Sequence, residues 1–299
     1  MSTIESKIQE EHDGKRIRLF LKEDLGISSR MIRSASIEKR ILVNNIPVKM
    51  DYNLKVNDNV VVNLFKEESQ NITPEPMDLD IVYEDEDIIV VNKSPNMIVH
   101  PTKNNKSGTL ANGLLHYFKE TNQKCIVRLV SRLDMDTSGL IIIAKHQFAH
   151  MQLSKDMTED KVEKRYIAVV HGNLEKKEGT IDLPIYRPDG EGAVRRVIDD
   201  RGQRSITHYK VIERLKDADI VECILETGRT HQIRVHLKAL GHPIYGDTFY
   251  GDENDNELIN RQALHAYGLN LKSPRTKKVL ELRASLPDDI KNLIEIIKK

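Results

Sequence analysis

The chain has 299 residues, and its 46 Lys and Arg side chains balance 46 Asp and Glu side chains, so the formal net charge is zero. This length suffices for one large domain or two of ordinary size. Two cysteines argue against a disulfide framework, the first residues form no apolar signal segment, and no apolar run is long enough to span a membrane. We therefore expect a cytoplasmic protein and exclude the secreted and membrane classes.

Charge is distributed unevenly along the chain. Residues 14–49 carry nine basic and three acidic side chains, whereas residues 66–91 carry one basic and nine acidic side chains. The basic segment predicts a short charged helix, a second helix beginning at Ser28-Ser29, a strand over 41–43, a turn at Asn44-Asn45 and a strand over 60–64. Four basic side chains on or just after the second helix predict a positive face: Arg30, Arg33, Lys39 and Arg40.

A polar, acidic stretch with two prolines, residues 66–76, predicts a linker between a first unit (1–65) and a second domain (77–299). In the second domain the residue patterns predict helices over 109–119 and 148–157. They predict strands over 81–83, 88–91, 140–144, 166–170, 206–212, 220–225, 264–271 and 278–283. Strands outnumber helices and rarely alternate with them, which predicts an α+β fold with a large mixed, mostly antiparallel sheet.

The densest cluster of polar residues is RLDMDTSG at positions 132–139, directly before the apolar run 140–144. A loop that leads into a rigid buried strand is a common place for catalytic side chains. Asp134 and Asp136 are therefore candidate nucleophiles or acid–base groups. The alternative is a hydrogen-bonded turn with a solvated acidic pair, and this segment alone leaves both open.

A second polar cluster spans residues 226–243, which follow a strand and predict a helix with Thr230 as its N-cap. Arg229 stands just before this helix, and we expect it to pair with Asp134. An arginine beside a buried aspartate favours the charged carboxylate, which then serves as a nucleophile or base. The alternative is a structural buried ion pair without a catalytic role.

The histidines of this cluster do not predict a metal site. His231 and His236 are five residues apart, about 140° around a helix, so they do not share a face. The sequence also lacks the spacings typical of zinc ligands. We therefore expect no metal, and we expect His231 to be a core residue or a support for the site.

Four segments in order resemble the motifs of the RluA-type pseudouridine synthases, which isomerise uridines in ribosomal large-subunit RNA and tRNA. They are residues 87–101, 132–140 (RLDMDTSGL), 164–172 (KRYIAVVHG) and 227–236 (TGRTHQIRVH). Four ordered motifs are far more specific than one. Residues 14–65 resemble the S4-like RNA-binding domain, from Ser29-Arg30 to the strand–turn–strand at 41–48, with Asn45 where glycine is common.

The resemblance implies roles for individual residues. Asp134 matches the family's essential aspartate, and Arg229 matches the arginine that pairs with it. Tyr166 matches the tyrosine that packs on the target base and is a candidate for removing the C5 proton. Arg132 matches an arginine that fills the gap left by the flipped uridine, and Ser131 stands where many members have histidine.

The implied reaction breaks the N1–C1′ bond, turns the uracil and joins C5 to C1′, so it needs no cofactor. The uridine must first leave its stack, and the basic N-terminal side chains would hold the RNA, rRNA or tRNA, through its phosphates. Asp136 then becomes a partner of Thr137 and Ser138 in the loop. We expect a monomer without an obligate protein partner.

Two other function classes compete with this one. A non-catalytic RNA-binding or ribosome-assembly factor would explain the basic unit, but it would not require Asp134, Tyr166 and Arg229 together. A glycosidase would explain two neighbouring carboxylates. The absence of tryptophan and the scarcity of other aromatic residues disfavour a sugar-binding site.

Overall fold

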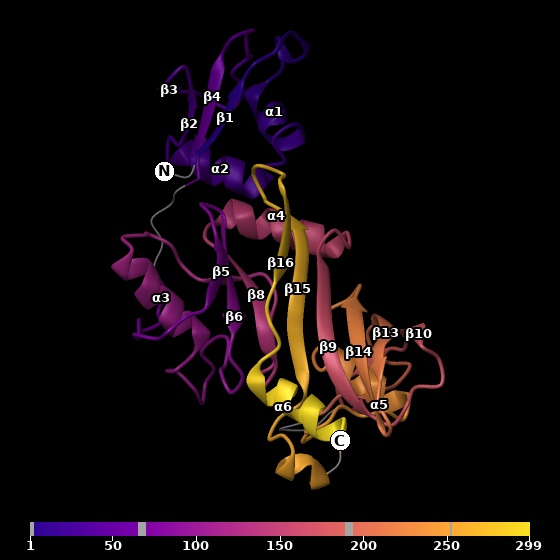
Figure 1. Cartoon of the computed structure of the whole chain (residues 1–299). Coiled ribbons are helices and arrows are strands. Elements are labelled where there is room, and N and C mark those ends of the chain that lie inside the picture. Colours follow the sequence, from indigo (N-terminus) through magenta and orange to yellow (C-terminus); the bar gives the residue numbers. More distant parts are fainter. Residues whose placement is uncertain (1–2, 65–69, 189–193, 252) are drawn as a thin grey trace.

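The computed structural model describes residues 3–64, 70–188, 194–251 and 253–299, which form two sheets of very different size (Figure 1). The N-terminal unit stands at one end of the molecule, beside the helix labelled α4. The large sheet runs through the rest of the chain. In the described part of the chain no helix is long and apolar enough to cross a membrane.

The N-terminal unit is an antiparallel four-stranded sheet with two helices, and the basic segment predicted both helices and the strands over 41–43 and 60–64. Its strands follow the order β1 (Thr3–Lys7), β4 (Asn59–Asn63), β2 (Ile41–Val43) and β3 (Ile46–Pro47), and its helices are α1 (Ile17–Glu23) and α2 (Ser29–Ile37). Ser28 caps α2 by accepting a hydrogen bond from the Met31 amide at 3.3 Å. Asn44 and Asn45 make the β2–β3 turn with φ of 50° and 66°, a region that asparagine tolerates.

The large sheet has ten strands and is antiparallel except where β15 meets β8, which confirms the predicted α+β class. Its main path is β10–β13–β14–β9–β15–β8–β6–β5, with β16 beside β15 and β7 beside β8. The strand bounds are β5 (Ile81–Glu84), β6 (Ile88–Lys93), β7 (Arg128–Leu129), β8 (Ser138–Ala144), β9 (Glu163–His171), β10 (Glu178–Asp182), β13 (Ile206–Arg214), β14 (Ala218–Leu225), β15 (Leu264–Lys272) and β16 (Val279–Arg283). A separate hairpin pairs β11 (Ile185–Tyr186) with β12 (Val197–Ile198).

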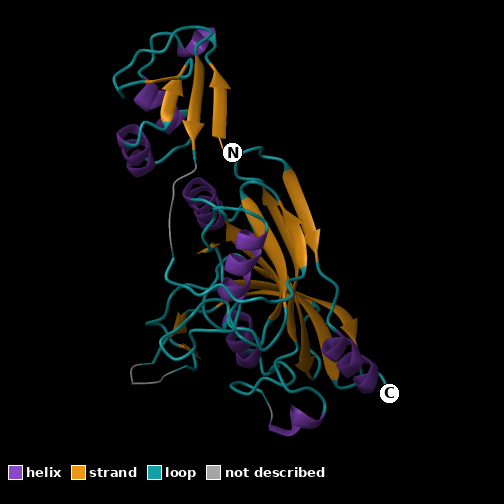
Figure 2. Cartoon of the chain, turned by 90° about the vertical axis from the view of Figure 1, so that its left-hand side faces the viewer, coloured by secondary structure: helices purple, strands orange, loops and turns teal. Residues whose placement is uncertain are grey.

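Helices cover the large sheet and explain its continuous apolar runs (Figure 2). One set of alternate residues of β6 and β8 packs on α3 (Leu110–Glu120), and the other set packs on α4 (Gln147–Thr158) and on residues of β15 and β16. Strands covered on both faces need apolar side chains at every position. Strands β9, β14 and β15 pack in turn on α5 (Gln232–Ala239) and α6 (Asp288–Ile297).

The N-terminal unit is docked on α4. The Phe148 ring of α4 is buried in the core of that unit, and the Gln152 side chain donates to the Gly26 carbonyl at 3.1 Å. At the other side of the junction, Arg275 donates to the Thr3 carbonyl at 2.8 Å. The two units therefore share apolar and polar contacts.

The stretch expected to be a linker is attached to the large unit over its second half. Residues 66–69 lie outside the described residues. From Gln70 onward the chain follows the large unit: the Gln70 side chain bonds both polar groups of the Val127 backbone at 2.8 Å, and Asn112 donates to the Thr73 carbonyl at 2.8 Å.

Candidate active site

The loop that carries Asp134 begins after β7 and ends where β8 meets β15. Gly139 has φ of +113°, and a Cβ built on it would lie 2.3 Å from the Ala266 carbonyl oxygen. No larger residue fits this close approach of two backbones. The glycine that marks the end of the polar cluster in the sequence therefore fixes the point at which the loop leaves the sheet.

A buried lysine binds the Asp134 loop from inside the protein. Lys93 is 1% exposed, and its amine donates to the carbonyls of Ser94, Met97 and Met135 at 2.7, 3.0 and 2.8 Å. Burial lowers the pKa of Lys93 to about 7, against the opposing effect of Asp136. The carbonyl next to Asp134 is thus fixed by an internal amine.

Three side chains that precede or begin β15 hold the rest of the loop. Arg261 donates to the Asp136 carbonyl at 2.9 Å, and Gln262 donates to the Thr137 hydroxyl at 3.1 Å. The Ser138 hydroxyl lies 2.9 Å from His265 Nδ1. The prediction that the Asp136 side chain stabilises Thr137 and Ser138 is therefore wrong, because these two hydroxyls bond to residues far along the chain.

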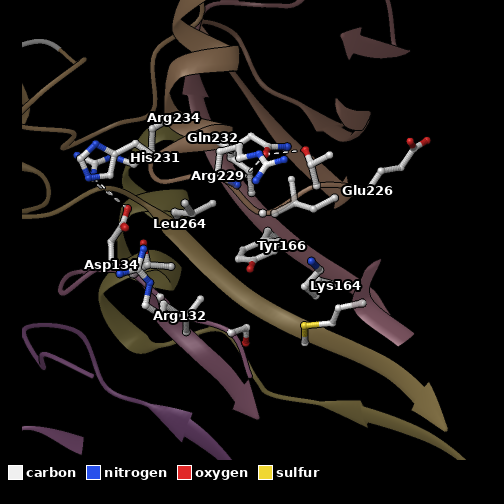
Figure 3. Close-up of a pocket in the computed structure, with 18 of the residues that line it drawn as sticks. Arg132, Asp134, Lys164, Tyr166, Glu226, Arg229, His231, Gln232, Arg234 and Leu264 are labelled. Carbon is white, nitrogen blue, oxygen red and sulfur yellow. Dashed lines mark hydrogen bonds and ion pairs between the residues drawn. The ribbon is translucent and has the colours of Figure 1, made fainter. Parts of the chain in front are cut away.

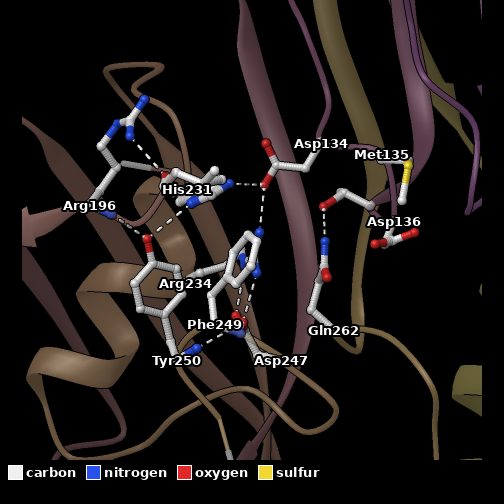
Figure 4. Close-up of polar contacts among 12 residues, drawn as sticks. Asp134, Met135, Asp136, Arg196, His231, Arg234, Asp247, Phe249, Tyr250 and Gln262 are labelled. Atoms are coloured by element: carbon white, nitrogen blue, oxygen red, sulfur yellow. Dashed lines mark hydrogen bonds and ion pairs between the residues drawn. The ribbon is translucent and has the colours of Figure 1, made fainter. Parts of the chain in front are cut away.

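The carboxylate of Asp134 is paired with Arg234, as Figure 4 shows. Arg234 Nη1 lies 3.1 Å from Asp134 Oδ2, and the rest of the guanidinium binds Asp247 through Nε and Nη2, both at 2.7 Å. Burial would lower the pKa of Arg234, but Asp247 and Asp134 outweigh it and raise the pKa. Asp247 thus orients a permanent cation toward Asp134.

The predicted pairing of Asp134 with Arg229 is wrong, although Arg229 lines the same pocket. The Arg229 amide donates to the Gln232 side chain at 3.0 Å, and its Nε is 3.4 Å from the Arg204 carbonyl. The physical reason is the start of α5. His231, not Thr230, is the N-cap, with φ of 60°, and this left-handed residue turns the chain so that the first helical turn, not the preceding loop, meets Asp134.

Asp134 opens into a pocket of about 650 Å³ between the loop, β9 and the segment before α5 (Figure 3). This volume is in the range of sites for small ligands. Tyr166, from the centre of β9, forms part of its wall, and Arg132 lies at its rim with an exposed side chain. Ser131 also lines the pocket, at the position where many members of the family that the chain resembles have histidine. The pocket therefore unites the predicted residues Asp134, Tyr166, Arg229 and Arg132.

Tyr166 is 8% exposed, and burial raises its pKa, with Asp134 adding to the effect. Its phenol is therefore neutral at physiological pH. His231 is also buried: Nδ1 lies 3.0 Å from the Tyr250 hydroxyl and Nε2 lies 3.8 Å from Asp134 Oδ2. Burial lowers the pKa of His231 despite Asp134, so the neutral ring supports the site, as the sequence indicated.

His236 faces elsewhere, with Nδ1 at 2.9 Å from the Thr207 hydroxyl, as its distance of five residues from His231 predicted. Among residues 3–64, 70–188, 194–251 and 253–299 there is no group of three or more His, Cys, Asp or Glu side chains arranged for a metal ion.

The basic side chains of the N-terminal unit divide into two kinds. Arg30, Arg33 and Lys39 are exposed. Arg40 is partly buried and donates to Glu38 at 2.9 Å and to the Asn63 carbonyl at 2.8 Å, so it braces the end of α2 against β4. Arg40 therefore serves the fold of this unit, and of the four cations of the predicted positive face only Arg30, Arg33 and Lys39 are exposed.

Three functional residues lacked a predicted role: Arg234, Lys93 and Arg261. Lys93 and Arg234 lie inside two of the four motifs, 87–101 and 227–236, whereas Arg261 lies outside all of them. The available signal was a charged residue at a position that the sequence pattern predicts to be buried. Examples are an arginine in an otherwise amphipathic helix and a lysine at the end of an apolar strand, and both imply a partner inside the protein. The partner itself, such as Asp247, lies too far along the chain for the pattern to indicate it.

Comparison with known proteins identifies the family of this chain. A protein-family model described as RNA pseudouridylate synthase matches residues 87–239. The chain is 41% identical to the uncharacterized RNA pseudouridine synthase YlyB of Bacillus subtilis, over 100% of this chain and 99% of that one. It is 36% identical to the ribosomal large subunit pseudouridine synthase D of Buchnera aphidicola, over 94% of each chain.

Among solved structures, human RNA pseudouridylate synthase domain containing 1 matches with a TM-score of 0.59 and 27% identity, over 75% of this chain and 97% of that one. The family model covers the loop of Asp134, strand β9 with Tyr166, and helix α5 with Arg234. The chain therefore belongs to the RNA pseudouridine synthase family and is an RNA uridine isomerase.

Proposed function

We propose that this enzyme converts specific uridines of large-subunit ribosomal RNA to pseudouridine, with tRNA as the second candidate substrate, and that it acts in the cytoplasm as a monomer. The observation that carries the proposal is Asp134, ion-paired at 3.1 Å to buried Arg234 at the mouth of a pocket walled by Tyr166. Relatives named for the large ribosomal subunit, at 36–40% identity, support the choice of rRNA.

In this proposal Asp134 is the essential catalytic group. It attacks C1′, attacks C6 of the base, or removes a ribose proton, and in each case it must be charged. The Arg234 guanidinium, fixed by Asp247, favours the carboxylate and holds its direction. The uracil stays enclosed while it turns, with the neutral Tyr166 ring as part of the wall.

The surroundings of the pocket suit an RNA that must give up one base. Arg132 is exposed at the rim, where it would enter the stack as the uridine leaves. We propose that the N-terminal unit, residues 1–65, is an S4-like module that holds structured RNA with Arg30, Arg33 and Lys39, and that residues 77–299 form the catalytic domain. All three cations are exposed and can meet phosphates.

The test is pseudouridine mapping of rRNA and tRNA at single-nucleotide resolution in a strain lacking the gene. Complementation with the wild-type gene should restore the lost sites, and complementation with Asp134→Asn should not. Loss of sites in large-subunit rRNA supports the proposed substrate, and loss in tRNA alone replaces it. If every pseudouridine persists without the gene, the proposed function is wrong.

A further inference from the structure

Strand β9 presents two side chains to the pocket, of which Tyr166 is one and Lys164 is the other (Figure 3). Alternation along the strand puts residues two apart on the same face. The residue between them, Arg165, points to the opposite face and is paired there with Glu163 at 2.7 Å and Glu222 at 3.1 Å. Lys164 is therefore held toward the pocket by a central strand with neighbours on both sides.

A cation that is shielded from solvent normally has a hydrogen-bond acceptor or an ion-pair partner. No hydrogen-bond acceptor or ion-pair partner of Lys164 Nζ occurs among the residues that the structure describes, and the residue is partly buried. Burial lowers the pKa of Lys164, and the charge of Asp160 opposes the shift only in part. The amine reaches across the pocket wall to within 3.8 Å of the place a Cβ would take on Gly228.

Of the other charged side chains of this wall, Asp160 acts on Lys164 through its charge without a hydrogen bond to it, and the two nearest to Gly228 are already engaged. Glu226 is bonded to His208 at 2.6 Å and points away from the pocket in Figure 3. Arg229 turns toward the Arg204 carbonyl. A desolvated ammonium without a partner is destabilising. Residues that lower stability in this way are characteristic of sites that await a ligand.

The ligand available to this amine is the uracil ring of the target uridine. We propose that Lys164 is a further catalytic residue, whose ammonium meets a carbonyl oxygen of the flipped uracil and stabilises the negative charge that develops on the base. This inference rests on the proposed function only in that the pocket beside Asp134 receives the uridine.

The charge arises whichever route Asp134 follows. If the N1–C1′ bond breaks, its electron pair stays with the base, and the resulting anion is shared by N1 and the two carbonyl oxygens. The sugar carbon is compensated by bonding to the Asp134 carboxylate or by loss of its neighbouring proton. If Asp134 adds to C6, the charge appears on the C4 oxygen. When C5 joins C1′, C5 loses its proton and N1 gains one, so the reaction remains an isomerisation.

The test is the full-length Lys164→Met variant, which keeps the length of the side chain and removes the charge. Its single-turnover rate constant on a target RNA should fall about 10²-fold, the usual effect of losing one preorganised donor to a developing oxyanion. The dissociation constant for the RNA should stay unchanged. The urea midpoint of unfolding should rise, because an unpaired and partly desolvated charge has been removed.

Lys93→Met is the control, since Lys93 is a fully buried lysine whose amine donates to three carbonyls, whereas the amine of the partly buried Lys164 has no such acceptor among the described residues. Its urea midpoint should fall, because those carbonyls lose their donor. The urea midpoint is thus expected to rise for Lys164→Met and to fall for Lys93→Met, which distinguishes a functional lysine from a structural one.

Two results would overturn the inference. A Lys164→Met enzyme with the wild-type rate would show that the amine does not act on the base. An unchanged rate together with weaker RNA binding and a shallower salt dependence would identify a phosphate as its ligand. Neither result affects the proposed function, which is tested separately by pseudouridine mapping in the strain lacking the gene.

Discussion

Asp134 depends on one guanidinium that is itself fixed by a second carboxylate. Arg234 is 3% exposed and bridges Asp134 and the fully buried side chain of Asp247. Removing the central cation leaves a buried carboxylate uncompensated, which is among the most destabilising changes in a protein core. The Asp134–Arg234 ion pair therefore matters both for the stability of the site and for the charge of Asp134.

We predict that Arg234→Gln abolishes pseudouridine formation and lowers the free energy of unfolding by about 3–5 kcal/mol. Arg229→Gln should leave stability within about 0.5 kcal/mol of wild type, since Arg229 is exposed and its hydrogen bonds are made by its own amide and to the Arg204 carbonyl. Urea titrations of both variants, followed by activity assays, check this. Equal destabilisation by the two substitutions would contradict the assignment of Arg234.

Gly139 is the second residue on which the site depends. Gly139→Ala should cost at least about 3 kcal/mol, because the new Cβ would meet the Ala266 carbonyl in a backbone conformation strained for alanine. Gly108→Ala is the control: it has φ of +66° but no atom within 4 Å of the new Cβ, so it should cost about 1 kcal/mol. Similar losses in thermal or urea unfolding would argue against a steric role for Gly139.

The sequence predicted that Asp134 and Tyr166 belong to the site because each lies in a single short motif. It failed for Arg234 because two arginines five residues apart were equally consistent with the pattern, and the choice depends on the left-handed backbone of His231. Nothing local indicates φ of 60° at a histidine. The pairing partner Asp247 is likewise supplied by the tertiary fold.

At the scale of elements, the site is built on the parallel contact between β8 and β15. His265 of β15 bonds Ser138 of β8 at this contact, and its ring is 1% exposed. The predicted strands match observed strands where the sequence contains a continuous apolar run or a regular alternation of apolar and polar residues. Strands β1 and β10 were not predicted, because they are short, carry charged residues and lie at sheet edges.

The β8–β15 contact predicts a dependence of stability on pH. Burial lowers the pKa of His265 from its ordinary value of 6.5 to about 4, so the unfolded chain binds a proton at a higher pH than the folded one. The stabilisation is therefore complete above about pH 6.5 and is lost as pH falls toward 4. Between pH 7 and pH 5 wild type should lose about 2 kcal/mol of unfolding free energy that His265→Gln retains.

Urea titrations of the two proteins at both pH values provide the measurement. Glutamine can still bond Ser138, so the comparison isolates the titration of the imidazole. If wild type and His265→Gln lose the same stability between these pH values, His265 is not the group responsible.

At the scale of the whole molecule, the N-terminal unit, which carries the exposed Arg30, Arg33 and Lys39, is joined to the large unit through α4 (Figure 1). The docking contacts at Phe148 and Gln152 fix the two units relative to each other. If the N-terminal unit holds RNA as proposed, this fixed arrangement would present the target uridine to one place.

We predict that the combined substitution Arg30→Gln, Arg33→Gln and Lys39→Gln weakens RNA binding and flattens its salt dependence, by roughly 0.9 in the logarithmic slope for each phosphate that is no longer neutralised. The single-turnover rate at saturating enzyme should be nearly unchanged. Neutralising Lys291, Lys298 and Lys299 on or next to α6, at the other end of the molecule, is the matched control. An equal effect of both triple variants would argue against a specific RNA-binding face.

The central claim is that Asp134, held by Arg234, performs the isomerisation. Purified wild-type and Asp134→Asn enzymes should be incubated with rRNA from a strain lacking the gene, and pseudouridine should be mapped on the product. We predict site-specific pseudouridine with wild type and none with Asp134→Asn, while both proteins bind the RNA with similar affinity. Pseudouridine formation by Asp134→Asn at a rate near that of wild type would contradict this claim.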